Sequence, residues 1–370
     1  MALTKVFRSP LQVRENQQLM RKMRQIESEK AQHPALITTL ADALRGQAAQ
    51  HGQRPRPEHA VLAAWTLCSA VLTTRYASVR HNAVTTAGAA LRAIHVRHRS
   101  NDAPTLAPLV QQLLRAAEED NTGPLVVRSG FATPKALRAS LAWYRCGLFV
   151  VEDFGGTPPA VREALDTMLD ADGCLQSPFG RADPIAHALP TYAELSFIGA
   201  RRYETLLHSG DRAVLGAFAR ALVLDMPAAD GSDAAALDPV SFSPVLRWMR
   251  EVLVRARDDG DWQLRRRDGL KALLLAVDDG AQTELQCFMV ECEERCRTLA
   301  QEWRPLTAFS ADKARRLALV HALASDPEAD VVQAPDARYA VTYVRALDDA
   351  LLDRVASRQA PEQSETTASA

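Results

Sequence analysis

The stretch CGLFVVEDFGG, residues 146–156, places two acids directly after an apolar run and ends in a glycine pair. Leu148–Val151 are all apolar, which is typical of a strand covered on both faces within a parallel sheet. Glu152 and Asp153 follow this run. Carboxylates at the end of a buried strand can hold a magnesium ion and activate water. Glu152 and Asp153 are therefore the first candidate catalytic residues.

Apolar runs and helical patterns alternate on both sides of this strand. Strands separated by helices predict an α/β fold with a parallel sheet. A polar helix is predicted first, at 11–31. The predicted strands are 124–130, 147–151, 193–200 and 220–227, with a short strand ending at 83–84, and the other predicted helices are 34–50, 59–71, 88–98, 105–118, 133–143 and 158–171.

Beyond residue 238 the pattern predicts helices only, near 242–257, 280–303, 311–325 and 336–356. A polar segment follows, which predicts a disordered tail. The sequence thus divides into an N-terminal helical region (1–55), an α/β core (56–230), a helical C-terminal region (231–357) and a tail (358–370).

Charge, cysteine spacing and the lengths of apolar runs set expectations about partners and cofactors. The formal net charge of the 370 residues is −1, so an interaction with nucleic acid would depend on local basic patches. None of the cysteines forms a CxxC pair, and no His pair accompanies Cys287, Cys292 and Cys296, so we predict reduced thiols and no metal site. No apolar run approaches the ~20 residues of a membrane span, and no secretion signal begins the chain. We expect a cytoplasmic protein without a membrane partner.

Four short motifs follow one another in a characteristic order: TPKAL (133–137), FVVEDFGG (149–156), LSFIGA (195–200) and GAFARALVLD (216–225). With the helical segment 311–347, this order resembles the P-loop ATPase core of helicase-like and primase-helicase-like proteins of phages, plasmids and integrated elements. The resemblance implies a RecA-like parallel sheet with helical regions on either side in the sequence. It also implies a DNA partner and a homo-oligomer.

The phosphate-binding loop of that family lacks its chemistry here. In G-x-x-x-x-G-K-[ST], glycines let backbone N–H groups surround the phosphates, while the lysine and hydroxyl contact phosphate and magnesium. At the expected position the chain has AVTTAGAA (83–90), with Ala83, Gly88, Ala89 and Ala90 at the four key positions, and GK[ST] occurs nowhere else. The acids also read Glu-Asp instead of the family's Asp-Glu. We predict a degenerate nucleotide site; a strand–turn–helix unrelated to nucleotides is the alternative.

Three arginines lie where the resembled family places functional arginines. Arg201 and Arg202 follow the LSFIGA strand, and Arg220 lies in GAFARA. Such arginines sense phosphate or reach into a neighbouring subunit's site. Arg220 is therefore a third candidate catalytic residue. The alternative is an ordinary salt bridge or a solvated strand end.

Three basic clusters are candidate DNA contacts, because lysine and arginine side chains neutralise nucleic-acid phosphates. Each cluster can equally be a solvated helix face, and acids interleave with the last one. The candidate DNA-binding residues are Arg21, Lys22, Arg24, Arg97, Arg99, Arg265, Arg266 and Arg267.

Three functions are consistent with these features. We favour a non-catalytic helicase/ATPase-like scaffold of a mobile genetic element, acting in DNA replication or maintenance through DNA or partner binding and self-assembly, without a cofactor. The first alternative is an active DNA-dependent ATPase or helicase that uses Mg-ATP, with Lys135, Arg80 or Arg92 replacing the missing lysine. The second is a protein-interaction module that needs no nucleotide.

Overall fold

The fold is known from a computed structural model. It describes residues 33–50, 55–75, 78–80, 86–98, 106–117, 126–128, 133–137, 146–168, 191–209, 211–225, 242–258 and 273–366. Several sequence predictions lie outside these ranges, namely the helix at 11–31 and the candidate residues Arg21, Lys22, Arg24, Ala83, Arg99, Arg265, Arg266 and Arg267.

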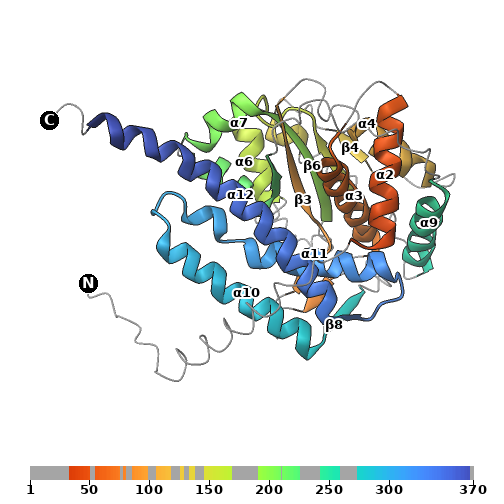
Figure 1. Ribbon diagram of the computed structural model, residues 1–370. Helices are drawn as coiled ribbons and strands as arrows, with labels where there is room; N and C mark the ends of the chain where they lie inside the picture. The colour runs from red at the N-terminus through yellow and green to blue at the C-terminus, as the bar shows by residue number, and fades with distance from the viewer. Residues whose placement is uncertain are drawn as a thin grey trace.

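A five-stranded sheet, parallel throughout, forms the centre of the protein (Figure 1). The strand order is β4-β5-β6-β3-β7. The predicted α/β fold with a parallel sheet is therefore confirmed, and each of the four strands predicted between 124 and 227 is present. The strands are β3 (Arg92–Arg97), β4 (Val126–Arg128), β5 (Cys146–Val151), β6 (Thr191–Gly199) and β7 (Leu222–Leu224).

The central strand β3 corrects the sequence analysis, which predicted a helix over 88–98. β3 lies between β6 and β7, with His95 opposite Phe197 on one side and Leu224 on the other. Alternate residues face opposite sides, so Ala93 joins one hydrophobic cluster while Ile94 joins the other. The run GAALRA has strong helix formers, and pairing with two neighbouring strands overrides that local preference.

Four helices cover one face of the sheet. The helix α3 lies directly on the strands, and nearly all of its residues are buried because helices surround its other sides. Ala93, Leu148 and Leu195 of the sheet share one hydrophobic cluster with these helices. Figure 1 shows them on one side of β3 and β6. The helices are α2 (Ala35–Gln50), α3 (Pro57–Leu72), α4 (Leu106–Ala117) and α9 (Ser243–Asp258).

The opposite face packs against a second hydrophobic cluster. Phe149, Val151 and Ile198 belong to it, together with Tyr203 of α7 and Phe218 of α8. The C-terminal helix α12 adds Leu351 and Val355 to the same cluster. The elements on this face are α6 (Pro159–Met168), α7 (Ala200–Leu207), α8 (Arg212–Arg220), the 3-10 helix η3 (Arg304–Thr307) and part of α12 (Ala334–Thr366).

A second, smaller sheet has the order β2-β1-β8-β9. Its strands are β1 (Ser78–Arg80), β2 (Thr86–Gly88), β8 (Leu274–Val277) and β9 (Val331–Val332), and the 3-10 helix η1 (Thr73–Arg75) precedes β1. β1 pairs antiparallel with β2 and parallel with β8. The prediction that the C-terminal region is helical only is therefore wrong, since β8 and β9 belong to that region and β8 pairs with β1.

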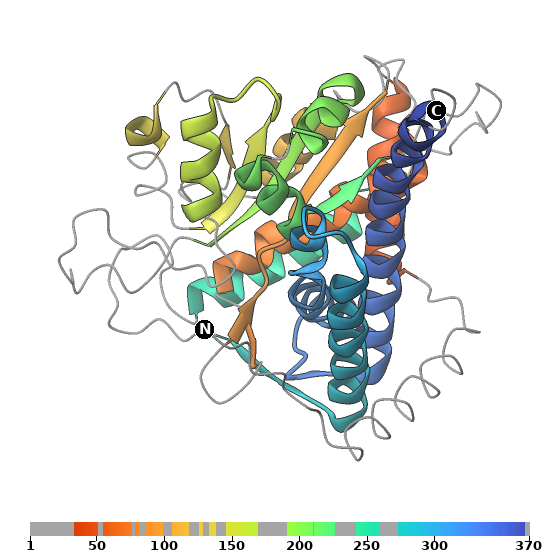
Figure 2. The same ribbon diagram turned by 90° about the vertical axis from the view of Figure 1, so that its left-hand side faces the viewer.

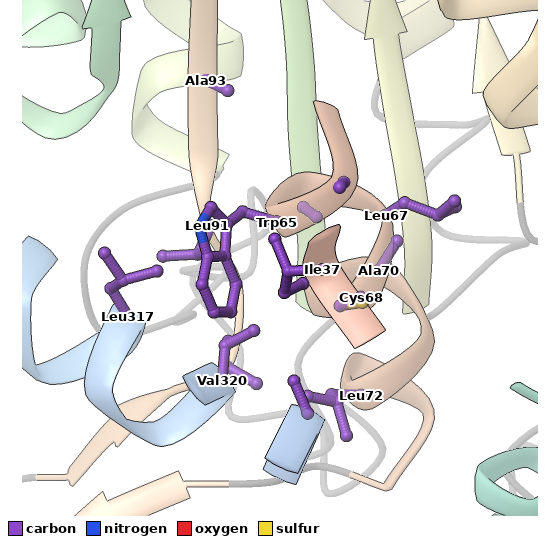
Figure 3. Packing of buried hydrophobic residues seen from close by; sticks show 14 of the residues in the cluster. Ile37, Trp65, Leu67, Cys68, Ala70, Leu72, Leu91, Ala93, Leu317 and Val320 are labelled. Carbon is purple, nitrogen blue, oxygen red and sulfur yellow. The ribbon is translucent and has the colours of Figure 1, made fainter. Parts of the chain in front are cut away.

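The C-terminal helices belong to the same core as the sheet. α10 (Asp279–Thr298), α11 (Ser310–Ser325) and α12 pack on one another, and α10 and α12 run side by side in Figure 2. Figure 3 shows Trp65 of α3 next to Leu91, with Leu317 and Val320 of α11 beside it. The helix α12 continues to Thr366, past the boundary at 358 where a disordered tail was expected.

A buried group of aromatic rings joins α11 and α12 to α3. The indole N–H of Trp65 donates to the Tyr339 hydroxyl at 3.0 Å, and the Tyr339 ring lies 4.6 Å from His321. His321 Nδ1 is 2.6 Å from Asp336 Oδ1, and the backbone N–H of Gln333 donates to the other oxygen of Asp336. Asp336 thereby caps the first turn of α12 and anchors α11 at once.

Candidate functional site

The sheet has a point where the chain leaves neighbouring strands toward opposite faces. After β3 the chain reaches α4, whose Leu109 and Leu113 join the cluster on one face. After β6, which is hydrogen-bonded to β3, it enters α7, whose Tyr203 joins the cluster on the other face. Open α/β sheets bind ligands at such a switch point, outside the carboxyl ends of the strands. The carboxyl ends of β3, β5, β6 and β7 are therefore the candidate functional site.

The two candidate acids occupy the turn that follows β5. Glu152 and Asp153 are both exposed, whereas Phe154 is buried and donates its backbone N–H to Phe197 O at 2.9 Å. The carboxylate of Asp153 accepts the backbone N–H of Gly156 at 3.0 Å. Asp153 thus stabilises its own turn.

Close packing around this turn leaves little room for a side chain at either glycine. A Cβ on Gly156 would collide with Asp153 Oδ2, and a Cβ on Gly155 would lie 2.6 Å from Arg202 Cγ. Contacts this short are not tolerated without a shift of the neighbour. Arg202, from the first turn of α7, therefore lies directly across the β5 turn, which brings two of the sequence-predicted segments together.

Arg97, a candidate DNA contact at the end of β3, makes contacts within the protein. Arg97 donates from Nη2 to the carbonyl oxygen of Glu152 at 3.2 Å, and its guanidinium lies 5.8 Å from the centroid of the Phe197 ring. Nε2 of the next residue, His98, lies 2.5 Å from Oδ1 of Asp225, which follows β7. These contacts hold the ends of β3, β5 and β7 in register.

The helix α12 closes one side of the candidate site. Arg354 bridges Asp225, with Nε 3.3 Å from Oδ2, and Glu204 of α7. The side chain of Asp225 is nearly buried. Its Oδ1 contacts His98 and its Oδ2 contacts Arg354, so both carboxylate oxygens have partners within the protein. The hydroxyl of Tyr203 is buried nearby without a hydrogen-bond partner among the described residues, and burial together with Asp225 raises its pKa. Tyr203 stays protonated.

Several other candidate residues lie away from this end of the sheet. Arg220 precedes β7 at the amino end of that strand, where its guanidinium lies 4.4 Å from the Phe309 ring centroid. Arg92 forms a buried ion pair with Glu194 at 2.7 Å. Arg220 is thus at the opposite end of the sheet from the candidate acids Glu152 and Asp153.

The segment expected as a phosphate loop is also misplaced. Gly88 ends β2, and Ala89 and Ala90 connect β2 to β3, so the segment joins two strands instead of a strand and a helix. The backbone carbonyl groups of this segment already face hydrogen-bond donors from other parts of the protein. Ser69 Oγ donates to Ala89 O at 2.6 Å, and Arg316 Nη1 lies 3.4 Å from Ala90 O and 3.5 Å from Gly88 O. Carbonyl groups facing a guanidinium are the reverse of N–H groups facing a phosphate.

A buried histidine pair was missed by sequence reasoning. Nδ1 of His59 lies 2.9 Å from Nδ1 of His95, and the His95 ring stacks on Phe197. Burial, and next the proximity of His59, lowers the pKa of His95 well below its usual range. His95 is therefore neutral, and one ring nitrogen donates to the other. The two residues are 36 positions apart, without a local pattern to reveal the contact.

The comparisons with known proteins assign no family. No protein-family model and no curated protein matches the chain. Within the described residues, no three His, Cys, Asp or Glu side chains are grouped as metal ligands. Among the helices in the same ranges, none is both long and apolar enough to cross a membrane.

Proposed function

We propose that the chain is a non-catalytic, ATPase-like scaffold protein of a mobile genetic element. The strand order supports a RecA-like core, the fold that the resemblance implies. Renumbered along the chain from β3, the order β4-β5-β6-β3-β7 becomes 2-3-4-1-5, which is the order of RecA-like sheets. The acids Glu152 and Asp153 follow the third of these strands, where such cores place the acids that hold magnesium.

The observation that carries the proposal is the sequence after β3. In this fold the phosphate loop follows the first core strand and precedes a helix, which corresponds here to HRSNDAPT, residues 98–105, directly before α4. His98 and Ala103 stand at the two glycine positions and Pro104 at the lysine position, whereas Thr105 retains the hydroxyl. Without the lysine, the charge on the transferred phosphoryl group lacks a main stabilising contact.

The described side chains do not fit Mg-ATP either. His98 and Asp225 are paired with each other, and the carboxylate of Asp153 bonds to its own turn. Each of the replacements considered for the lysine is unsuited. Arg92 is buried against Glu194, Arg80 lies in the small sheet and Lys135 lies after the second core strand. We therefore favour the scaffold over the active ATPase.

Such a scaffold would act in replication or maintenance of the element by binding DNA or a replication partner and by self-assembly. The described residues give DNA binding limited support, because Arg97 is engaged with Glu152 and Phe197. The other proposed DNA contacts lie outside the described ranges. The three functions differ in outcome: the scaffold binds without turnover, the ATPase hydrolyses ATP, and the interaction module does neither.

The test uses the full chain. ATP hydrolysis is measured with and without single- and double-stranded DNA, beside the double variant Glu152→Gln/Asp153→Asn. DNA binding is measured by fluorescence anisotropy over a salt series, because phosphate contacts weaken steeply with salt. Light scattering gives the oligomeric state. We expect salt-dependent DNA binding or self-assembly without turnover above the protein-free blank.

Two results would overturn the proposal. Turnover that is stimulated by DNA and lost in the double variant would establish the active ATPase. If the protein is a monomer, hydrolyses no ATP and binds neither single- nor double-stranded DNA, the nucleotide-independent interaction module is the remaining function.

A further inference from the structure

His33 lies where the start of α2 meets α12. It precedes Pro34, whose carbonyl oxygen accepts the backbone N–H of Thr38 at 3.0 Å and so begins the first turn of α2. Nδ1 of His33 is 2.5 Å from the hydroxyl oxygen of Tyr339, and the His33 ring lies 6.3 Å from the Tyr343 ring. His33 is exposed, whereas Tyr339 is buried. A side chain that solvent protons can reach therefore joins the start of α2 to a buried part of α12.

The other partner of Tyr339 fixes where the protons of this contact lie. An indole N–H can only donate, so the Tyr339 oxygen accepts from Trp65 at 3.0 Å. The hydroxyl hydrogen of Tyr339 then needs an acceptor, and Nδ1 of His33 is the acceptor that the described residues place beside it. A buried hydroxyl hydrogen without an acceptor would destabilise the fold. Nδ1 of His33 is therefore unprotonated, and the neutral ring carries its hydrogen on Nε2.

The groups that surround the contact favour the neutral ring. His321 of α11 is paired with Asp336 of α12. Glu58 of α3 faces Tyr343, whose pKa is raised by burial and further by this carboxylate. Partial burial lowers the pKa of His33, and the proximity of His321 lowers it further. The contact is therefore complete above the ordinary histidine pKa of about 6.5 and is lost as the pH falls below it.

From this geometry we propose that His33 is an acid-sensitive latch between α2 and α12. Neutral His33 accepts the Tyr339 hydroxyl and holds the start of α2 in place. A proton on Nδ1 turns the acceptor into a donor that faces another donor, which opens the contact. The rest of α2 is held independently, because Ile37, Leu40 and Leu44 are buried in the larger hydrophobic cluster. Opening is therefore confined to the first turn of α2, and it involves neither nucleotide nor DNA.

The test is hydrogen–deuterium exchange of the full chain at pH 7.0 and pH 5.5, corrected for the pH dependence of the intrinsic exchange rate. The Thr38 amide closes the first turn of α2 and reports the latch, whereas amides of β6 report opening of the whole fold. Electron-transfer fragmentation in the mass spectrometer resolves these amides. Because His95 also titrates in this range, the wild type is compared with variants that keep His95.

The diagnostic variant is His33→Asn. An asparagine side-chain carbonyl oxygen lies near the position of histidine Nδ1 and can accept the Tyr339 hydroxyl, but it does not titrate. The matched control is His208→Asn, at the exposed histidine that follows α7. Between pH 7.0 and pH 5.5, protection of the Thr38 amide should fall at least about fivefold further in the wild type and in H208N than in H33N. Amides of β6 should change equally in all three proteins.

A second variant removes the hydroxyl from the other side of the contact. In Tyr339→Phe, protection of the Thr38 amide at pH 7.0 should already match that of the wild type at pH 5.5, with little further response to pH. An equal fall in H33N and the wild type would overturn the latch, as would the absence of any fall in the wild type. Full wild-type protection of Thr38 in Y339F at pH 7.0 would show that this contact does not hold the start of α2, and would overturn it as well.

Discussion

The two ends of the five-stranded sheet differ in the partners of their buried polar side chains. At the amino end, Arg92 is paired with Glu194, and Ser69 Oγ accepts the N–H of Leu91 while it donates to Ala89 O. At the carboxyl end, Arg162 and Tyr203 keep buried polar atoms that have no partner in the described residues. The amino end is held by a buried ion pair, although Nη2 of Arg316, beside Ala90, is also buried there without a hydrogen-bond partner among the described residues.

The largest expected effect comes from breaking the matched end. Glu194→Ala leaves the Arg92 guanidinium buried without its carboxylate, and also removes the acceptor of the Ser196 hydroxyl. We expect a loss of about 3–5 kcal/mol in the free energy of unfolding. Urea unfolding at neutral pH measures it.

The control is the double variant Arg92→Met/Glu194→Leu, which removes both charges. It is expected to recover most of the loss, because an apolar pair of similar volume replaces a buried ion pair at little cost. A loss below about 1 kcal/mol in Glu194→Ala would contradict the idea that the amino end is held by this pair.

A smaller effect depends on pH and on the His59–His95 pair, which lies between α3 and β3. The pKa of His95 is lowered in the folded state, so below pH 6.5 the unfolded state binds more protons. The contribution of neutral His95 to the free energy of unfolding is therefore fully present above pH 6.5 and is lost as the pH falls. For one proton the slope cannot exceed about 1.4 kcal/mol per pH unit, so the loss at pH 5 is at most about 2 kcal/mol.

The measurement compares urea unfolding of the wild type and His95→Phe at pH 7 and pH 5. The stability advantage of the wild type should shrink at the lower pH, by at most about 2 kcal/mol. His208→Gln, at an exposed histidine, is the matched control and should follow the wild type at both values. Parallel curves for the wild type and His95→Phe would refute the assignment of a neutral, buried His95.

The smallest effect sharpens the description of the open end. Gly156→Ala forces a Cβ against the carboxylate of Asp153. We expect a loss of about 1 kcal/mol, the low end of the overpacking range, because a short carboxylate can rotate away. Thermal unfolding measures it. In an Asp153→Ala background the same glycine substitution should cost less; equal costs in both backgrounds would show that Asp153 is not the group that requires Gly156.

Sequence patterns predicted the parts of the fold whose signal is local. The apolar runs of β5 and β6 and the helical patterns of α2, α3 and α4 were recognised because burial leaves a period in the sequence. β3 was missed because GAALRA favours a helix, and only its neighbours β6 and β7 make it a strand. The same error placed the expected phosphate loop before residues 92–97, whereas the proposed ATPase-like core would have it after them.

The candidate site was predictable only in part. Glu152, Asp153 and Arg202 were marked by their place after apolar runs, and the structure does bring their segments together. Contacts such as His98 with Asp225, or Asp225 with Arg354, join residues more than a hundred positions apart. Long-range pairs of this kind leave no periodicity or spacing for sequence reasoning to detect.

The pairing of β1 with β8 has a consequence for synthesis on the ribosome. Ser78 lies opposite Leu274, so β1 cannot pair with β8 until about 200 further residues have been synthesised. At roughly 5–20 residues per second this delay is on the order of 10–40 seconds. Throughout that time β1 presents an open edge that β2 protects on one side only. Until residue 274 has been made, this edge of β1 is therefore open to pairing with other chains.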